Sequence, residues 1–549
     1  MKLDSARRIE NLMLELVAIR SDTGTRWEKE VEAYLFKWLG RCDYFRQNPN
    51  LYGQYALSQD PLDRTVVWGL LKGKGDQTVI LMHHHDVVDA YDYGNLSRWA
   101  YAPEALSQAL AEVALTEEVR ADLAGGEWLF GRGTADMKGG AAIQLVLLED
   151  LSRQRSLKGN VLLLSLPDEE SLSVGMRGCL HLLIDLQQKF NLQYKMLINS
   201  EPHFRDADGQ GIFYEGSAGK VLPVIYVRGQ KTHIGQIYQG FNPVLLLSEI
   251  VLQTELNTDF SDRVRGEVAP PPSWSYFRDR KEAYDASIPG SAGGYLSLIS
   301  LKQTPRALIQ QLKNSCEVAI SRVIAKIHAS YTAHSRNNLA QGSLPSWRVN
   351  VKTFAELYAE AAHDAHEAFV EDYARTVDKI SAEVRQERLN APEATFRMIE
   401  KTLSYVADLA PVVVIALAPP YYPPINNGDF QSLPKRVRKV GEHLIRLAAD
   451  RWGEAYKRLN YMIGITDMSY AALQNGENIV PYIGPNMPLW QKTYEIPFAA
   501  MEALAIPVIN IGPWGKDCHK FTERVLKRDL VARTPLLLER AVQYLLAEP

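Results

Sequence analysis

The chain has 549 residues, more than one typical hydrophobic core accommodates, so at least two domains are expected. Its net charge of −4 lacks the basic surplus of nucleic-acid-binding proteins, and no apolar run reaches the roughly 18 residues that could span a membrane. The first residues carry no apolar secretory signal, and the four cysteines are scattered. We therefore expect a cytoplasmic protein that binds neither nucleic acid nor a membrane.

The first part of the chain alternates helical patterns with short apolar runs. Helical periodicity covers residues 5–40, and further helices are expected at 138–153 and 174–188. The expected strands lie at 66–71, 79–82, 161–164 and 196–198. Continuous apolar strands that alternate with helices predict an α/β sheet covered on both faces.

The pattern changes after residue 215. Expected strands lie at 220–228, 292–301 and 411–417, and expected helices at 242–255, 306–334 and 354–405. The proline-rich residues 419–427 predict a linker, after which the α/β alternation resumes near residue 434 and ends in a helix at 534–547. We therefore predict one α/β domain formed by 1–215 plus 430–549, interrupted by an inserted α+β domain at 216–429.

Five segments that follow predicted strands carry side chains able to bind divalent cations. They are His84-His85-Asp86, Gly131 to Asp136, Asp168-Glu169-Glu170, Glu201 and Cys518-His519. Ligands of open α/β sheets bind at the carboxyl ends of the strands, which is where these segments fall. Imidazoles and carboxylates suit zinc, manganese and cobalt, so the pattern predicts a metal site without fixing the metal.

Each motif alone also has a structural interpretation. The histidines could mark a polar strand end, Asp136 could cap the following helix, and 168–170 could be a solvated loop. Three adjacent acids nevertheless repel one another unless a cation neutralises them. The chain has no HExxH, GxSxG or P-loop lysine motif, so the common alternatives lose their support. Five coincident strand ends favour metal binding.

The motif set resembles the dinuclear-zinc exopeptidase family that includes aminoacylase, glutamate carboxypeptidase and succinyl-diaminopimelate desuccinylase. The family pattern of His-x-Asp, GRGxxDMKG, DEE, a later Glu and a His followed by Glu is found at 84–86, 131–139, 168–170, 201 and 519–523. Residues 464–470 and 486–488 most resemble RocB-type members, which implies a role in arginine catabolism. The resemblance implies a mixed-sheet catalytic domain interrupted by an enlarged lid domain.

The resemblance also implies a ligand set. One metal would be held by His84, Asp136 and Glu201, and the other by Asp136, Glu170 and His519. Asp136 would bridge the two ions, and the peptide bond after it would be cis. Two divalent metal ions are expected, with zinc first and manganese or cobalt as alternatives.

Three further residues take catalytic roles by the same resemblance. Asp86 would orient His84, and Glu169 would be the general base and then the acid for the leaving amine. His233, which follows Gly229-Gln230-Lys231-Thr232 in the insert, would stabilise the oxyanion. In dimeric relatives a neighbouring subunit supplies this histidine, so a homodimer through the lid domain is an open option.

We accordingly expect a metal-dependent hydrolase of a small-molecule amide, either a peptide or an N-acyl amino acid derivative, that uses a water activated by two metals. Two alternatives stay open. One is a non-catalytic metal-binding or regulatory protein of the same fold. The presence of Glu169 argues against it, because a site that has lost its activity usually loses the general base. The other is a hydrolase of ureido or guanidino compounds.

Overall fold

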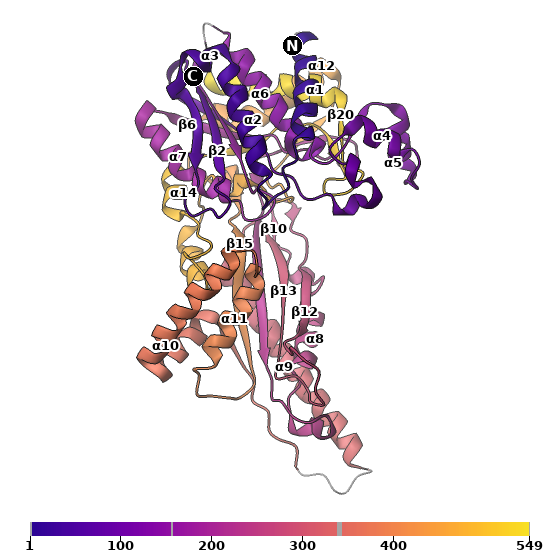
Figure 1. Ribbon diagram of the computed structural model, residues 1–549, viewed down its shortest axis with the longest axis vertical. Helices are drawn as coiled ribbons and strands as arrows, with labels where there is room; N and C mark the ends of the chain where they lie inside the picture. Colours follow the sequence, from indigo (N-terminus) through magenta and orange to yellow (C-terminus); the bar gives the residue numbers. More distant parts are fainter. Residues whose placement is uncertain (1–2, 155–156, 337–342, 548–549) are drawn as a thin grey trace. The chain divides into compact units, whose positions relative to one another are not determined.

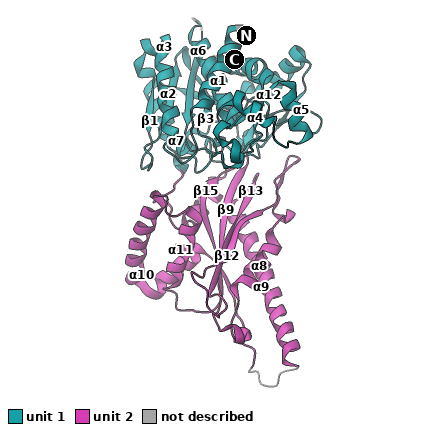
Figure 2. Ribbon diagram, turned by 45° about the vertical axis from the view of Figure 1, so that its right-hand side comes forward, with its two compact units in different colours: residues 1–217, 425–474, 497–549 teal, residues 218–424, 475–496 magenta. Residues whose placement is uncertain are grey.

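The computed structural model describes residues 3–154, 157–336 and 343–547, which form two compact units (Figure 2). Unit 1 comprises Met1–Ser217, Ile425–Gln474 and Pro497–Pro549, and unit 2 comprises Ala218–Pro424 and Asn475–Ile496. The sequence-based division placed residues 475–496 in the catalytic domain, but here they group with the insert. Hydrogen bonds explain this, because Ala355 N–H donates to Asn486 Oδ1 at 3.1 Å and the Tyr494 hydroxyl to the Tyr421 carbonyl at 3.0 Å.

Unit 1 is built on an eight-stranded sheet in the order β1-β2-β5-β3-β6-β18-β7-β17. Figure 1 labels two of its strands, β2 and β6. The strands are β1 (Tyr52–Ala56), β2 (Thr65–Leu71), β3 (Lys74–His84), β5 (Lys158–Leu166), β6 (Gln193–Asn199), β7 (Gly211–Tyr214), β17 (Tyr456–Leu459) and β18 (Val508–Asn510). Strand β3 pairs in parallel with β5 and β6, whereas β2 pairs antiparallel with β1 and β5. The prediction of a mixed-sheet α/β fold is confirmed.

The central strands are buried because helices cover them. Alternate strand residues such as Val79 and Leu81 share one core with α1 (Leu3–Ala18), α6 (Gly139–Ser152), α12 (Lys435–Trp452) and α15 (Thr534–Leu546). Helix α6 contacts α1, α15, β3 and β5, as expected for a helix that is apolar around most of its circumference. Each such buried aliphatic side chain contributes roughly 1.5–3 kcal/mol to folding.

The helical pattern at 5–40 is two helices rather than one. Helix α1 ends at Ala18 and α2 (Glu28–Arg41) begins ten residues later. The backbone between them runs beside the segment after β3, because Asp22 forms a parallel bridge with Val87 and Thr23 N–H donates to the Val87 carbonyl at 2.9 Å. This break between α1 and α2 therefore brings Asp22 and Thr23 next to the segment that follows β3.

The proline-rich segment is not the linker that its composition predicted. Strand β15 (Val412–Tyr422) continues through Pro419–Pro420, whose peptide bond is cis, and β16 (Ile425–Asn426) pairs with β8 (Gly216–Ser217). Strand β14 (Asn350–Thr353) pairs with β15 only as far as Ile415. Beyond Ile415 that edge of β15 makes no ladder with β14, so a proline without N–H is accommodated there.

Unit 2 contains a five-stranded sheet in the order β12-β13-β9-β15-β14. Its remaining strands are β9 (Gly219–Arg228), β12 (Ser273–Asp279) and β13 (Ser291–Ser300), and its main helices are α8 (Pro243–Thr254), α9 (Pro305–Ser335), α10 (Phe354–Arg385) and α11 (Ala391–Leu403). One sheet face shares a core with α10 and α11, and α8 packs on β9 and β13 beside α9 (Figure 2). A search of the described helices finds none long and apolar enough to cross a membrane.

Candidate metal centre

The predicted ligands of unit 1 meet at the carboxyl edge of its sheet. His84 is the last residue of β3, Glu170 follows β5, and Glu201 follows β6. These three strands are parallel neighbours, so the segments that leave them converge on one edge. Asp136 lies in the turn after β4 (Trp128–Phe130), and His519 lies in the loop between β19 (Gly515–Lys516) and β20 (Arg524–Leu526).

Asp136 presents one oxygen to each of two imidazoles. Its Oδ1 lies 3.1 Å from His84 Nε2, and its Oδ2 lies 3.3 Å from His519 Nε2. Glu201 Oε1 is 3.2 Å from the same His84 nitrogen, and Glu170 Oε2 is 3.0 Å from the same His519 nitrogen. Ligand atoms around one tetrahedral zinc ion lie about 3.3 Å apart, so both groups have the spacing of a coordination sphere.

Glu169 lies within reach of the same cluster. The ligand atoms of His84, Glu169 and Glu201 lie within 4.8 Å of one another, as do those of His84, Asp136 and Glu170. Glu169 therefore has a carboxylate oxygen beside the candidate ligands. The donor set is imidazole nitrogen and carboxylate oxygen throughout, which fits zinc, manganese or cobalt.

Asp86 connects His84 to the acidic loop formed by residues 168–170. His84 Nδ1 is 3.0 Å from the Asp86 carbonyl oxygen and 3.4 Å from its Oδ1. The Asp86 carboxylate also accepts the backbone N–H groups of Glu169 at 3.1 Å and Glu170 at 3.2 Å. The expected role was the orientation of His84 alone, and the structure adds a contact that places both glutamates.

Two residues that the sequence analysis gave no role support Asp136. Glu523 Oε1 accepts the backbone N–H groups of Ala135 and Asp136, both at 3.2 Å, and its Oε2 accepts from Arg132 Nη1 at 2.7 Å. Helix α6 begins at Gly139 without a capping side chain, so Asp136 is not its cap. The Asp136–Met137 bond is cis, as the resemblance implied. Arg132 stands in the Gly-Arg-Gly motif, but no local pattern reveals its partner.

The cluster carries more buried carboxylates than cations. Burial opposes the protonation of His84, yet the Glu201 and Asp136 carboxylates outweigh burial and raise its pKa well above the ordinary value. Hydrogen bonds to Asp136 and Glu170 raise the pKa of His519 to about 11. Burial, with Asp136 nearby, raises the pKa of Glu201 to about 8. Such a set of mutually repelling acids fits a site for divalent cations.

Two more histidines beside His84 are buried in the neutral form, which predicts a pH-dependent stability. Burial lowers the pKa of His83 to about 4 and that of His85 to about 3. Since the unfolded chain takes up these protons near pH 6.5, the free energy of unfolding falls as the pH drops below that value. For His85 the loss amounts to about 2 kcal/mol at about pH 5.

The free energy of unfolding of the wild-type protein should fall between about pH 7.5 and about pH 5, and we expect His85→Gln to reduce this fall by about 2 kcal/mol. Urea unfolding of the metal-free protein measures it. His363→Gln is the control, because the His363 side chain is 87% exposed. An identical pH dependence in wild-type and His85→Gln protein would contradict the prediction.

His233, the eighth predicted site residue, lies in unit 2. It is exposed and caps the short helix η4 (Ile234–Gln239), where its Nδ1 accepts the Gly235 N–H at 3.1 Å. An Nδ1 that accepts is unprotonated, so Nε2 carries the hydrogen and is the donor. His233 is thus an exposed imidazole with a defined tautomer.

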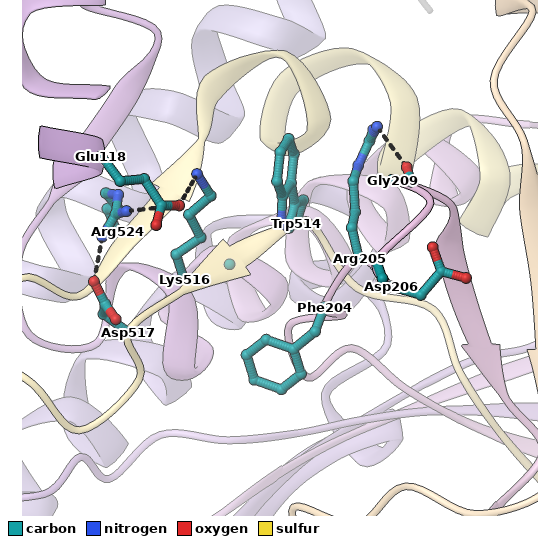
Figure 3. A pocket seen from close by; sticks show the side chains of 11 residues that line it. Glu118, Phe204, Arg205, Asp206, Gly209, Trp514, Lys516, Asp517 and Arg524 are labelled. Atoms are coloured by element: carbon teal, nitrogen blue, oxygen red, sulfur yellow. Dashed lines mark hydrogen bonds and ion pairs between the residues drawn. The ribbon is translucent and has the colours of Figure 1, made fainter. Parts of the chain in front are cut away.

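A pocket of about 470 Å³ lies beside the segment that leads to His519 (Figure 3). Trp514 is one of its lining residues, and the centre of its ring lies 4.3 Å from the Arg205 guanidinium, 5.1 Å from Lys516 Nζ and 4.9 Å from the Trp128 ring. The charged lining residues Glu118, Arg205, Asp206, Lys516, Asp517 and Arg524 are each paired with other described residues. The predicted site residues do not line it, and the segment before His519 is held by the ion pairs of Asp517 with Arg524 and of Lys516 with Asp122.

Comparison with known proteins identifies the family. Residues 80–539 match the model of peptidase family M20/M25/M40. The chain belongs to this family. The predictions of a dinuclear-zinc exopeptidase relative and of a metal-dependent hydrolase are thereby confirmed.

Two similar proteins of Bacillus subtilis (strain 168) match nearly the whole chain. The protein YqjN is 33% identical over 545 residues, which cover 98% of this chain and 96% of YqjN. RocB is 30% identical over 557 residues, which cover 99% and 96%. The predicted likeness to RocB is confirmed.

Two solved structures support the fold. The M20 family metallo-carboxypeptidase Sso-CP2 from Sulfolobus solfataricus aligns with a TM-score of 0.53 at 12% identity, over 98% of this chain and 99% of that one. A tripeptidase from Staphylococcus aureus subsp. aureus mu50 aligns with a TM-score of 0.51 at 12% identity, over 98% and 99%.

Proposed function

We propose that the protein hydrolyses an amide bond in a small peptide or N-acyl amino acid, using two divalent cations. The observation that carries the proposal is the Asp136 carboxylate, whose two oxygens each face a different imidazole backed by a different glutamate. His84, Asp136 and Glu201 would hold one ion, and Asp136, Glu170 and His519 the other. When bound, two such ions lower the pKa of a shared water and polarise the substrate carbonyl.

The chain's own side chains supply proton transfer and orientation. Glu169 accepts the proton of the attacking water and passes it to the leaving amine, a role that its place beside His84 and Glu201 supports. Asp86 holds the His84 ring and the backbone of the acidic loop. In unit 2, the Nε2–H of His233 donates to the developing oxyanion, either in its own chain or in a second copy.

Metal-dependent release of a free amino acid tests the proposal. A panel of N-acetyl amino acids, dipeptides and N-carbamoyl amino acids should include arginine derivatives, because of the likeness to RocB. We expect turnover of an N-acyl compound or a dipeptide that falls at least about 10²-fold after chelation and returns with zinc, manganese or cobalt. Turnover that survives complete chelation would contradict the proposal, and turnover of N-carbamoyl compounds alone would move the substrate to the ureido class.

A further inference from the structure

A buried arginine lies behind the acidic loop of residues 168–170. Arg64 is 5% exposed and donates from Nη1 to Asp168 Oδ1 at 2.7 Å and to Glu28 Oε1 at 2.8 Å. Its Nη2 donates to Asp60 Oδ1 at 2.7 Å. One guanidinium thus faces three buried carboxylates, which join α2, the turn before β2 and the end of β5 in unit 1.

Asp168 is held through both its backbone and its side chain. Its N–H donates to Glu28 Oε2 at 2.9 Å, while its Oδ2 accepts the Val174 N–H at 3.1 Å. Its φ angle is 67°, in the left-handed region, which non-glycine residues adopt uncommonly and aspartate more readily than most. Arg64 and Glu28 contact Asp168 on two sides, and the Ser173 N–H also donates to the Asp168 carbonyl at 2.7 Å, so that these three contacts together hold this conformation.

The residues that follow Asp168 are the general base and a proposed metal ligand. Glu169 and Glu170 are fixed on one side by Asp86, which accepts their N–H groups. On the other side the loop is fixed at Asp168, which Arg64 and Glu28 hold. We propose that Arg64 is a positioning residue: by holding Asp168 it sets the places of Glu169 and Glu170. This inference rests on the proposed function, since it takes both glutamates in the roles given above.

The geometry of a guanidinium is needed for this task. Nη1 reaches Asp168 and Glu28 together while Nη2 and Nε reach Asp60, so the planar fork spans three acids. A lysine ammonium offers one point charge and cannot reproduce the fork. Without the guanidinium the three carboxylates repel one another in a buried place, and the Asp168 side chain has to move.

A calorimetric titration of the metal-free protein with Zn²⁺, which measures the affinity for each zinc ion, tests the proposal without any substrate. In Arg64→Met we expect the weaker of two zinc equivalents to bind about 10–100-fold less tightly, because the Glu170 carboxylate is displaced. Arg64→Lys should give an intermediate loss. The zinc-saturated Arg64→Met protein should also lose on the order of 10²-fold in kcat with a smaller change in KM, because Glu169 is misplaced.

Arg533→Met is the matched control. The Arg533 and Arg64 side chains are equally exposed at 6%, and Arg533 pairs with Asp529 and Glu454 in the same unit. We expect Arg533→Met to lower thermal stability similarly but to bind both zinc equivalents like the wild type. If Arg64→Met does not fold, Asp168→Asn, which weakens the same ion pair, should show the same loss of zinc affinity.

Wild-type affinity in a folded Arg64→Met or Asp168→Asn protein would overturn the proposal, and so would an equal loss in Arg533→Met. Either result would leave the proposed function intact, provided that the wild-type protein itself binds two zinc ions. A wild-type chain that binds no zinc would overturn the proposed function and, with it, the role of Arg64.

Discussion

Replacing Glu169 with glutamine is expected to lower kcat by about 10²–10⁴-fold while both metal ions stay bound. Glutamine keeps the volume and the hydrogen-bonding carbonyl of glutamate but cannot accept a proton from water. The Glu169 side chain is buried beside His84 and Glu201, where its carboxylate can reach a water that is held between the candidate ligands. Steady-state kinetics together with elemental analysis of the same preparation measures both quantities.

The control for this substitution is Glu32→Gln. Glu32 is another buried glutamate of unit 1, held by the N–H and hydroxyl of Thr65 rather than by the candidate ligands. We expect nearly wild-type kcat in Glu32→Gln. Full activity in a metal-loaded Glu169→Gln protein would exclude Glu169 as the base and would require another group to accept the proton of the attacking water.

The sequence predicted three of the ligand-bearing segments because His84 ends a strand of the central sheet, and Glu170 and Glu201 closely follow two others. Strand β3 contains the apolar run 79–82, which His83 and His84 follow, and the mostly apolar second half of β5 ends two residues before Asp168. Parallel pairing then brings such ends together, which is a property of α/β sheets and needs no knowledge of loops. Hence periodicity and spacing were enough to predict that His84, Glu170 and Glu201 lie close together.

The contacts that support the candidate ligands could not be predicted from the sequence in this way. Arg132 and Glu523 are separated by most of the chain, and each is an ordinary charged residue until the fold places them 2.7 Å apart. Strand β15 illustrates another limit, since its two prolines predicted a linker and only the pairing along one edge makes them tolerable. Local rules failed wherever a distant partner determined the local conformation.

The bridging role proposed for Asp136 makes a distinct prediction about metal content. Asp136→Ala should reduce it from about two ions per chain to well below one, whereas Glu201→Ala and His519→Ala should each retain about one. The reason is that the Asp136 carboxylate offers one oxygen to each imidazole, to His84 at 3.1 Å and to His519 at 3.3 Å. Two cations about 3.5–4 Å apart also repel each other strongly unless an anion lies between them.

Elemental analysis after equilibration with limiting Zn²⁺ measures this difference. Glu215→Ala is the control, because Glu215 is a half-buried acid of the same unit that pairs with Arg458 at 3.2 Å, outside the ligand set. It should bind as much zinc as the wild type. If Asp136→Ala and Glu201→Ala lose the same single ion, Asp136 ligates one metal only, and the second ion must then be held by Glu170 and His519 without a shared carboxylate.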